Sequence, residues 1–119
     1  LMKAVEATKN NTTLTVQLAI NYGGWDEIAR AINKALSAGI TSFTPETLLS
    51  FVDNPSVPLP DMIVRSAGEE RLSGFMLLQS NYSEFGFYDD LWPDWNEAMV
   101  DRIVSDYQSR TRKYGGLVK

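Results

Sequence analysis

The sequence of 119 residues contains no cysteine and no histidine. Disulfide bonds, thiolate nucleophiles, imidazole bases and the usual zinc sites are therefore excluded. No apolar run approaches the roughly 18 residues of a membrane-spanning helix, and LMKAVEATKNN lacks the apolar core of a signal peptide. The chemistry that remains belongs to carboxylates, guanidinium groups, hydroxyls and backbone amides, for which a hard cation such as Mg²⁺ is the natural metal. The absence of cysteine favours a cytoplasmic protein.

Basic residues are also scarce, with 11 against 15 acidic ones and a formal net charge of −4. A nucleic-acid-binding domain typically carries a basic face, so we expect no nucleic-acid partner. Two places still combine basic residues, the pair Arg65 and Arg71 and the C-terminal stretch RTRKYGGLVK. Local pairs of guanidinium groups in an acidic protein favour a small anionic ligand over a polyanion.

Hydrophobic patterning predicts alternating strands and helices along the chain. Apolar and polar residues alternate over 14–20, which predicts a first strand, and short apolar runs predict two more over 61–65 and 84–89. Helices are predicted over 25–36, 43–52, 75–82 and from 94 towards 112. This order is typical of an α/β domain with a parallel sheet flanked by helices.

Residues that favour helix ends support three of these boundaries. Gly39 lies where a C-terminal glycine cap is expected. Thr44 can cap the second helix with its hydroxyl, and Pro45 suits its first turn. Asp94 and Glu97 have the spacing of a capping box, with aspartate in place of the usual serine or threonine. We therefore expect Asp94 to cap the last helix.

In a parallel sheet, ligands bind beyond the carboxyl ends of the strands. Two loops have this position, NYGG after the first predicted strand and RSAGEERLS after the second. Arg65 and Arg71 each offer a planar fork of donors that matches phosphate oxygens. Ser73 adds a hydroxyl near a predicted helix start, where an anion is favoured, and Gly68 lets backbone amides approach a ligand. These residues predict a clamp for a phosphate or diphosphate.

A second interpretation of the same residues stays open. The arginines could instead form ion pairs on a solvated loop, with Glu69, Glu70 or Asp61 as partners. Glu84 could ligate a metal ion that faces a diphosphate, or it could be a strand-end glutamate in water. Spacing alone favours the ion pairs and the solvated glutamate, because surface ion pairs are common.

Three stretches resemble the motifs of one enzyme family, in the family's own order. DMIVRSAGEERLSGFMLLQSNYSEFGFYDDLWPDW resembles the signature of the cis-prenyltransferases, the undecaprenyl diphosphate synthase family. That signature has an Arg, a small pair, Gly-Glu, Arg-Leu/Ile-Ser and Phe, followed by Gln, Tyr-x-Glu, an aromatic strand and Trp-Pro-Asp. LAINYGG resembles the family's Ala-x-Asn-Tyr-Gly-Gly element, and YQSRTRKYGG resembles its terminal Arg-x-Arg-Arg-Phe-Gly-Gly. The chain is therefore identified as a member of this family.

The resemblance implies an activity for the parent enzyme. Members of the family condense isopentenyl diphosphate repeatedly onto an allylic diphosphate such as farnesyl diphosphate, with Mg²⁺, and each new double bond is cis. The implied product is a long-chain polyprenyl diphosphate, in a bacterium undecaprenyl diphosphate for cell wall biogenesis. The resemblance further implies a cytoplasmic homodimer, with peripheral membrane contact through the lipid product.

The resemblance also assigns functional residues to positions of this sequence. The implied substrate-binding residues are Asn21, Arg65, Arg71, Ser73 and Gly115. Among these, Gly115 would reach the neighbouring subunit's site, and Asn21 would lie near the substrate end of its strand. Glu84 would help to bind Mg²⁺. Three positions depart from the family pattern, because Trp25 replaces an arginine, Gly74 replaces a common asparagine and Ala67 replaces serine or glycine.

One family element has no counterpart in this sequence. No stretch resembles His-x-x-Met-Asp-Gly-Asn-Gly-Arg, which carries the family's catalytic aspartate and its allylic diphosphate site. We therefore expect residues 1–119 to form the C-terminal part of a single cis-prenyltransferase domain, without a catalytic residue of its own. We expect the isolated chain to be inactive.

Two other functions stay open at this point. The chain could be a non-catalytic partner subunit of a heteromeric cis-prenyltransferase, or an inactive diphosphate-binding module. A non-catalytic subunit contributes mainly the terminal Arg-x-Gly element and has no need of a complete clamp. The presence of Arg65, Arg71, Ser73 and Glu84 together favours descent from a catalytic chain.

Overall fold

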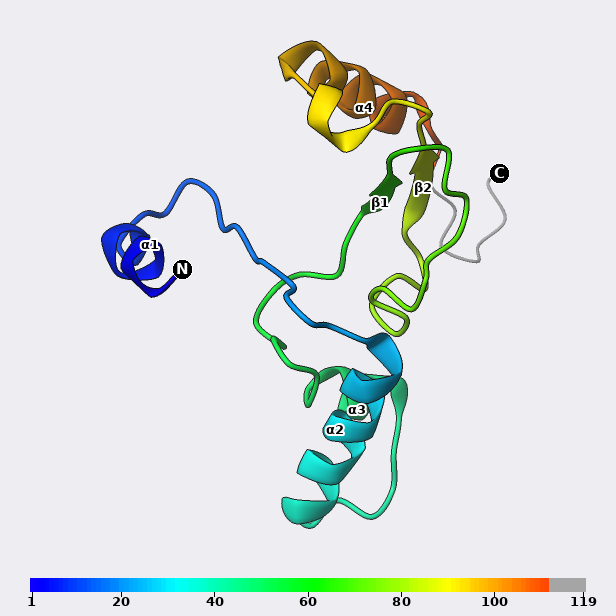
Figure 1. Cartoon of the computed structure of the whole chain (residues 1–119). Coiled ribbons are helices and arrows are strands. Elements are labelled where there is room, and N and C mark those ends of the chain that lie inside the picture. The colour runs from blue at the N-terminus through cyan, green and yellow to red at the C-terminus, as the bar shows by residue number, and fades with distance from the viewer. Residues whose placement is uncertain (112–119) are drawn as a thin grey trace.

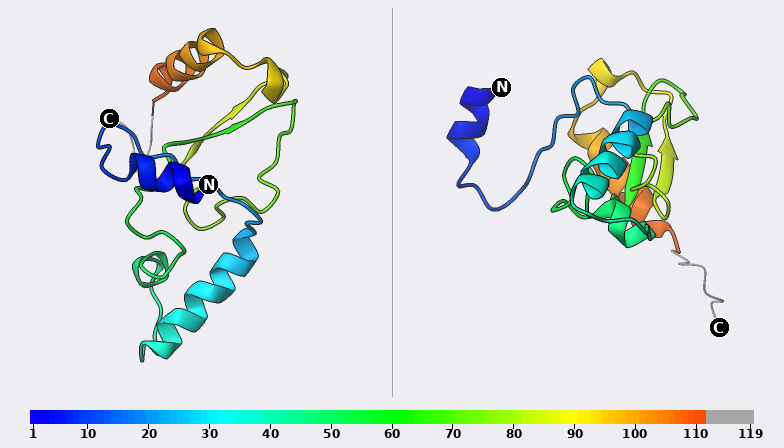
Figure 2. Two further views of the ribbon diagram at one scale, coloured as in Figure 1. Left: turned by 60° about the vertical axis from the view of Figure 1, so that its left-hand side comes forward. Right: turned by 90° about the horizontal axis from the view of Figure 1, so that it is seen from below.

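The computed structural model describes residues 1–111 of the chain (Figure 1). Its elements are, in order, α1 (Met2–Thr8), α2 (Gly24–Ser37), α3 (Pro45–Leu49), β1 (Met62–Arg65), β2 (Glu84–Phe87), a short 3₁₀ helix (Trp92–Asp94) and α4 (Glu97–Ser109). Figure 1 and the left view of Figure 2 place α4 beyond the strand pair, at the opposite end of the molecule from α2 and α3. Helices thus accompany strands throughout the chain, as expected for an α/β protein.

The two strands form a parallel pair, which confirms the predicted α/β class with a parallel sheet. Met62 lies opposite Glu84 and Arg65 lies opposite Phe87. The ladder extends one residue further, because the Tyr88 amide donates to the Arg65 carbonyl at 2.9 Å. Since both strands run in the same direction, the loop after Arg65 leaves from their carboxyl end.

The strand predicted over 14–20 is not formed among the described residues, so that prediction is wrong. The segment contains no strand and makes no backbone–backbone hydrogen bond with any described residue. Its apolar side chains are all exposed, with Leu14 at 76% and Ile20 at 66%. Alternation specifies which face a strand buries, but a strand also needs a hydrogen-bonded neighbour.

Helix α2 forms close to its predicted bounds and ends at the predicted glycine. Gly39 has a φ of 83°, and its amide donates to the Leu36 carbonyl while the Ile40 amide donates to Ala35, both at 3.0 Å. These two bonds and the left-handed glycine make a Schellman motif. The buried side of α2 carries Ala31 and Ala35, both fully buried, and it packs against α3.

Helix α3 confirms its predicted cap but is shorter than predicted. The Thr44 hydroxyl accepts from the Thr47 amide at 3.2 Å, and Pro45 occupies the first turn. The helix predicted over 75–82 is wrong, because this segment forms successive turns. Ser73 and Met76 have φ values of 50° and 47°, which a right-handed helix cannot accommodate.

The start of α4 differs from its predicted start by two residues. The cap is Asn96, whose side-chain oxygen accepts from the Met99 amide at 3.2 Å. Asp94 instead belongs to the 3₁₀ helix, so the predicted Asp94 capping box is wrong. Pro93 lies within that short helix and its ring restricts the backbone there, which leaves Asn96 as the next residue able to cap.

This assignment predicts opposite outcomes for two neighbouring substitutions. Asn96→Ala is expected to destabilise the chain by about 1 kcal/mol, because the Met99 amide loses its acceptor at the helix start. Asp94→Ala, the matched control, is expected to change stability by less than about 0.5 kcal/mol, as exposed substitutions usually do. Urea unfolding followed by circular dichroism measures both, and a larger loss for Asp94→Ala would contradict the assignment.

The hydrophobic core of the described residues is small. Its buried apolar members are Ala31, Ala35, Val52, Ile63, Tyr88 and Met99. Many large apolar side chains stay exposed, among them Trp25 at 76% and Trp92 at 70%. Within residues 1–111, no helix has both the length and the apolar character that crossing a membrane requires.

Candidate diphosphate-binding site

The two loops predicted to lie at the ligand edge are in contact. The Gly24 amide donates to the Gly74 carbonyl at 2.8 Å, and the rings of Tyr22 and Phe75 meet edge to face with centroids 5.6 Å apart. Gly24 is buried. A Cβ at this position would overlap the Gly74 carbonyl and come within 2.9 Å of Leu77 Cγ, so only glycine allows the loops to approach this closely.

Arg65 and Arg71 lie on the same loop and contact each other. Arg65, the last residue of β1, is partly buried, and its guanidinium donates to the backbone carbonyl of Arg71. The Arg71 side chain is 68% exposed and pairs with Glu69. One of the ion pairs considered from the sequence is therefore formed. An exposed pair of this kind contributes little stability, so an incoming anion can replace the carboxylate at low cost.

Left-handed backbone positions shape the loop between the arginines and beyond. Ala67, Gly68 and Ser73 have φ values of 62°, 65° and 50°. Ala67 and Gly68 donate their amides to the carbonyls of Asp90 and Tyr88, both at 3.0 Å. These bonds hold the strained positions in place against the segment after β2, which positions the loop at the carboxyl edge of the sheet.

Ser73 and Asn21 are both exposed on the two contacting loops. Asn21 has a φ of 52° and directly precedes the tyrosine of NYGG. The expected help of a helix dipole at Ser73 is absent, because turns and not a helix follow this residue. The remaining substrate-binding candidate, Gly115, lies outside the described residues.

Glu84 lies at the other end of the strand pair from Arg65. It begins β2 opposite Met62, whereas Arg65 ends β1 opposite Phe87. Three residues of strand correspond to roughly 10 Å along the sheet. The structure therefore brings Arg65, Arg71 and Ser73 onto one loop and does not bring Glu84 to them within this chain.

The carboxylate of Glu84 is bound by Arg110, which follows the end of α4. Arg110 donates to Glu84 Oε2 at 3.2 Å, to the Phe85 carbonyl at 2.7 Å and to Asp106 Oδ2 at 2.9 Å. The Tyr88 hydroxyl also donates to Asp106, at 2.8 Å. The bond from Arg110 is the main cause that lowers the pKa of Asp106, while burial raises the pKa of Tyr88.

The donor set around Glu84 fits Mg²⁺ only in part. A carboxylate oxygen is the ligand that this hard cation prefers. Within residues 1–111, however, no group of three or more aspartate, glutamate, histidine or cysteine side chains could hold a metal ion. Any magnesium site that uses Glu84 therefore needs oxygen ligands beyond a cluster of such side chains within this part of the chain.

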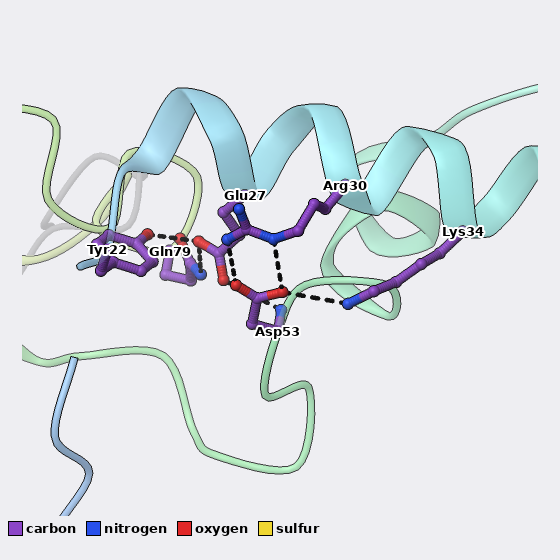
Figure 3. A network of polar contacts seen from close by, with 6 residues as sticks. All are labelled: Tyr22, Glu27, Arg30, Lys34, Asp53 and Gln79. Atoms are coloured by element: carbon purple, nitrogen blue, oxygen red, sulfur yellow. Dashed lines mark hydrogen bonds and ion pairs between the residues drawn. The ribbon is translucent and has the colours of Figure 1, made fainter. Parts of the chain in front are cut away.

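A buried carboxylate that supports the NYGG loop was missed in the sequence. Glu27 on α2 is only 3% exposed. Its Oε2 accepts from the Tyr22 hydroxyl at 2.5 Å and from Gln79 Nε2 at 2.8 Å, and its Oε1 accepts from the Asp53 amide at 3.1 Å (Figure 3). Burial, followed by the bond to Glu27, raises the pKa of Tyr22 to about 12.

Asp53 extends this network to the surface of α2. Its carboxylate accepts from Arg30 at 2.5 Å and from Lys34 at 3.1 Å (Figure 3). The bond from Arg30 is the main cause that lowers the pKa of Asp53. The signal that could have revealed the network is the spacing of Glu27, Arg30 and Lys34, which gives one helix face an ion-pairing stripe beside its alanines.

A pocket of about 680 Å³ lies beside this network. Residues of the segment before α2, of α3 and of the loop before β1 line it together with part of the 75–79 turn. The lining is mostly apolar and includes Val52, Leu59 and Met76, with Glu27 and Gln79 as the polar end. The pocket lining therefore includes neither Arg65 nor Arg71.

The parallel strand pair and its helices define an α/β protein, in which the loop after β1 contacts the NYGG loop. Residues 1–115 match the family model described as putative undecaprenyl diphosphate synthase. The chain therefore belongs to the undecaprenyl diphosphate synthase family of prenyltransferases.

Two curated relatives illustrate the similarity. The chain is 41% identical to an isoprenyl transferase of Clostridium tetani, over 98% of this chain and 48% of the relative. It is 43% identical to a trans,polycis-polyprenyl diphosphate synthase of Thermobifida fusca, specific for (2Z,6E)-farnesyl diphosphate, over 98% of this chain and 43% of the relative. The chain thus spans about half the length of the curated relatives that it matches.

Solved structures agree with this similarity. A probable undecaprenyl diphosphate synthase from Campylobacter jejuni superposes with a TM-score of 0.83 at 33% identity, covering 97% of this chain and 54% of that one. Lavandulyl diphosphate synthase from Lavandula x intermedia, in complex with dimethylallyl diphosphate, superposes with a TM-score of 0.87 at 30% identity, covering 97% and 52%. The described elements therefore have the arrangement of half of such a synthase.

Proposed function

We propose that this chain is the isopentenyl diphosphate-binding part of a cis-prenyltransferase that elongates an allylic diphosphate such as farnesyl diphosphate. The observation that carries the proposal is that Arg65 ends β1 and that the loop after it carries Arg71 and Ser73. The loop leaves from the carboxyl edge of parallel strands, where ligands of α/β proteins bind. The contact between Gly24 and Gly74 closes the second loop against it.

The chemistry of these side chains suits a diphosphate. Each guanidinium can donate two parallel hydrogen bonds to phosphate oxygens, and the serine hydroxyl can donate one further hydrogen bond. The exposed Arg71 exchanges Glu69 for the ligand, while Arg65 is already anchored by its backbone contact. These residues would bind and orient the diphosphate, so that their contribution to catalysis is positioning and charge stabilisation.

We further propose that Glu84 supplies a Mg²⁺ ligand to the site of a second copy in a homodimer. Glu84 lies roughly 10 Å along the sheet from the clamp of its own chain. It is bound by Arg110, from which the C-terminal stretch with Gly115 continues. In the proposed dimer this C-terminal stretch reaches the neighbouring subunit's site, and Glu84, held by Arg110, lies beside the start of the stretch. Bound Mg²⁺ would neutralise diphosphate charge.

The location and biological role follow from the proposed product. A polyprenyl diphosphate is a lipid, so a cytoplasmic enzyme would contact the membrane peripherally when it releases this product. In a bacterium the product would serve cell wall biogenesis. These proposals rest on the proposed activity, for which the loop after β1 remains the supporting observation.

The clamp is tested by calorimetric titration of the chain with isopentenyl diphosphate. Arg65→Ala and Arg71→Ala are each expected to weaken binding about 10- to 100-fold, because each removes charge-assisted hydrogen bonds of about 1.5–3 kcal/mol. Arg102→Ala is the matched control, since Arg102 on α4 makes an exposed ion pair with Asp90 and none with Arg65, Arg71 or Ser73. It is expected to change affinity less than twofold.

Two results would contradict the proposal. Equal losses of affinity at Arg65, Arg71 and Arg102 would mean that only net charge matters, and the clamp would be rejected. Binding without turnover, in an assay to which the unmatched half of a relative is added, would identify a diphosphate-binding module.

The proposed role of Glu84 is tested by titration with and without Mg²⁺. Glu84→Gln is expected to abolish the effect of Mg²⁺ on affinity in dimers and to leave the affinity without Mg²⁺ unchanged.

A further inference from the structure

Arg110 is shared by two carboxylates that come from different elements. It donates to Glu84 Oε2 on β2 at 3.2 Å and to Asp106 Oδ2 on α4 at 2.9 Å. A third bond, to the Phe85 carbonyl at 2.7 Å, fixes the guanidinium at the start of the strand. Two carboxylates against one guanidinium leave this group of side chains with one net negative charge.

Tyr88 fixes the position of Asp106 from the far end of β2. Its hydroxyl donates to Asp106 Oδ2 at 2.8 Å, and Tyr88 is only 6% exposed. The ring lies back over Gly86, where an added Cβ would come within 2.8 Å of Tyr88 Cε2. The backbone of Tyr88 is held in turn, because its amide donates to the Arg65 carbonyl. Asp106 is therefore anchored to the sheet independently of Arg110.

Asp106 is the main partner of Arg110, and Glu84 is the second. The hydrogen bond to Asp106 is the largest cause that raises the pKa of Arg110, ahead of the bond to Glu84. The three side chains are between 27% and 37% exposed, so their charges interact more strongly than they would in bulk water. The charge of Arg110 is thus compensated chiefly by Asp106, and Glu84 keeps its own negative charge.

We propose that Asp106 is a positioning residue for Glu84 and acts through Arg110. Arg110 holds Glu84 by Oε2, while Asp106 compensates the guanidinium charge, so that the held carboxylate still attracts a divalent cation. Without Asp106, Arg110 would pair with Glu84 alone, and that pair would be neutral. A nearby positive charge without compensation would then repel the cation. This inference rests on the proposed role of Glu84 as a Mg²⁺ ligand.

The experiment measures binding of Mn²⁺ alone to the 119-residue chain. Mn²⁺ prefers the same oxygen ligands as Mg²⁺, and it broadens the nuclear magnetic resonance signals of nearby amides, here those of Glu84 and Phe85. Asp106→Asn removes the charge and keeps an oxygen that can accept from the Tyr88 hydroxyl. We expect this variant to weaken Mn²⁺ binding about three- to tenfold at low salt.

Asp101→Asn is the matched control. It removes one negative charge from the same helix, and Asp101 is exposed. We expect it to change Mn²⁺ binding less than twofold. Asp106→Glu restores the carboxylate and is expected to recover most of the loss. The effect of Asp106→Asn should also shrink in about 1 M salt, where charges are screened beyond about 3 Å, whereas an effect on the fold alone would not shrink.

A second measurement uses no metal. While Asp106 and Glu84 both hold Arg110, rotation of the guanidinium is hindered, and its two Nη groups should give separate resonance signals. These signals are expected to merge in Asp106→Ala, which removes the acceptor of one Nη group. They are expected to stay separate in Asp101→Asn.

Four outcomes would overturn the inference. Equal weakening by Asp101→Asn and Asp106→Asn would mean that only net charge matters. Separate Nη signals in Asp106→Ala would mean that Asp106 does not hold Arg110. Broadening that is lost in Glu84→Gln but kept in Asp106→Asn would reject the role of Asp106 and leave that of Glu84 intact. Unchanged broadening in Glu84→Gln would reject the proposed metal role of Glu84, and this inference with it.

Discussion

Gly24→Ala is expected to separate the two loops of the candidate site and to weaken isopentenyl diphosphate binding at least tenfold. The added Cβ would overlap the Gly74 carbonyl and crowd Leu77 Cγ at 2.9 Å. One of these neighbours is backbone, which cannot move aside as a flexible side chain can. The hydrogen bond from the Gly24 amide to Gly74, 2.8 Å in the structure, must then lengthen or break.

Two opposing effects decide the stability of this variant. Alanine is favoured over glycine inside a helix by about 1 kcal/mol, and Gly24 is the first residue of α2. Overpacking of a buried position costs about 1–3 kcal/mol, and a broken buried hydrogen bond adds about 1–3 kcal/mol. The costs of overpacking and of the broken hydrogen bond together exceed the gain in helix propensity, so we expect net destabilisation of about 2 kcal/mol in urea unfolding.

Gly23→Ala is the matched control for this prediction. Its Cβ would meet only the flexible side chain of Asp26, at 2.9 Å, and its φ of −139° suits any residue. We expect affinity within twofold of the parent chain and a small change in stability. Equal effects of Gly23→Ala and Gly24→Ala on affinity would show that the loop contact does not support binding.

Glu27→Ala is expected to cause the largest loss of stability among single substitutions on α2. The change leaves the Tyr22 hydroxyl, Gln79 Nε2 and the Asp53 amide without their acceptor. Each buried donor left unpaired costs about 1–3 kcal/mol, and the site is only 3% exposed. We expect a loss of about 3 kcal/mol or more in urea unfolding.

A spectroscopic measurement distinguishes this role from simple packing. The pKa of Tyr22 is raised from 10.0 to about 12, mainly by burial and then by the bond to Glu27. The stability linked to this group is fully present below pH 10 and is lost as the pH rises through about 12. Absorbance titration of tyrosinate should show that one tyrosine ionises at lower pH in Glu27→Gln, because the negative charge is removed.

Asp26→Asn is the control for the Glu27 variants. Asp26 precedes Glu27 on the same helix but is exposed, so its change is expected to alter stability by less than about 0.5 kcal/mol. It should leave the titration of Tyr22 unchanged. If Glu27→Ala were as stable as Asp26→Asn, water would replace the lost acceptor. The three hydrogen bonds to Glu27 would then not stabilise the fold.

Local chemistry made much of the fold predictable. The Schellman motif at Gly39 and the Thr44–Pro45 start of α3 depend on residues within one or two turns, so their sequence signals suffice. The two short strands were predictable because apolar runs bounded by turns have few alternatives. The position of the loop between Arg65 and Arg71 at the carboxyl end of the strand pair was predictable, because this loop directly follows such a strand.

Other features could not be predicted from the local pattern. The choice of Asn96 over Asp94 as cap follows from the 3₁₀ helix that contains Pro93, whereas both residues suit a cap equally well in sequence. The turns over 75–82 replace a helix because left-handed positions at Ser73 and Met76 break its start. The sequence alone suggests that Glu27 is a surface glutamate, because only the fold brings its three donors, Tyr22, Asp53 and Gln79, together around it.

The sequence by itself determined the family, the parallel α/β class, the helix ends with local caps and the loop that concentrates two guanidinium groups. These depend on residue type and short spacing, which local physical chemistry controls. Only the tertiary structure decided that Glu84 lies away from Arg65, that Glu27 is buried with three hydrogen-bond donors around it, and that 14–20 makes no backbone–backbone hydrogen bond within residues 1–111. Each of these is a relation between distant segments, and backbone pairing and burial, not local pattern, determine it.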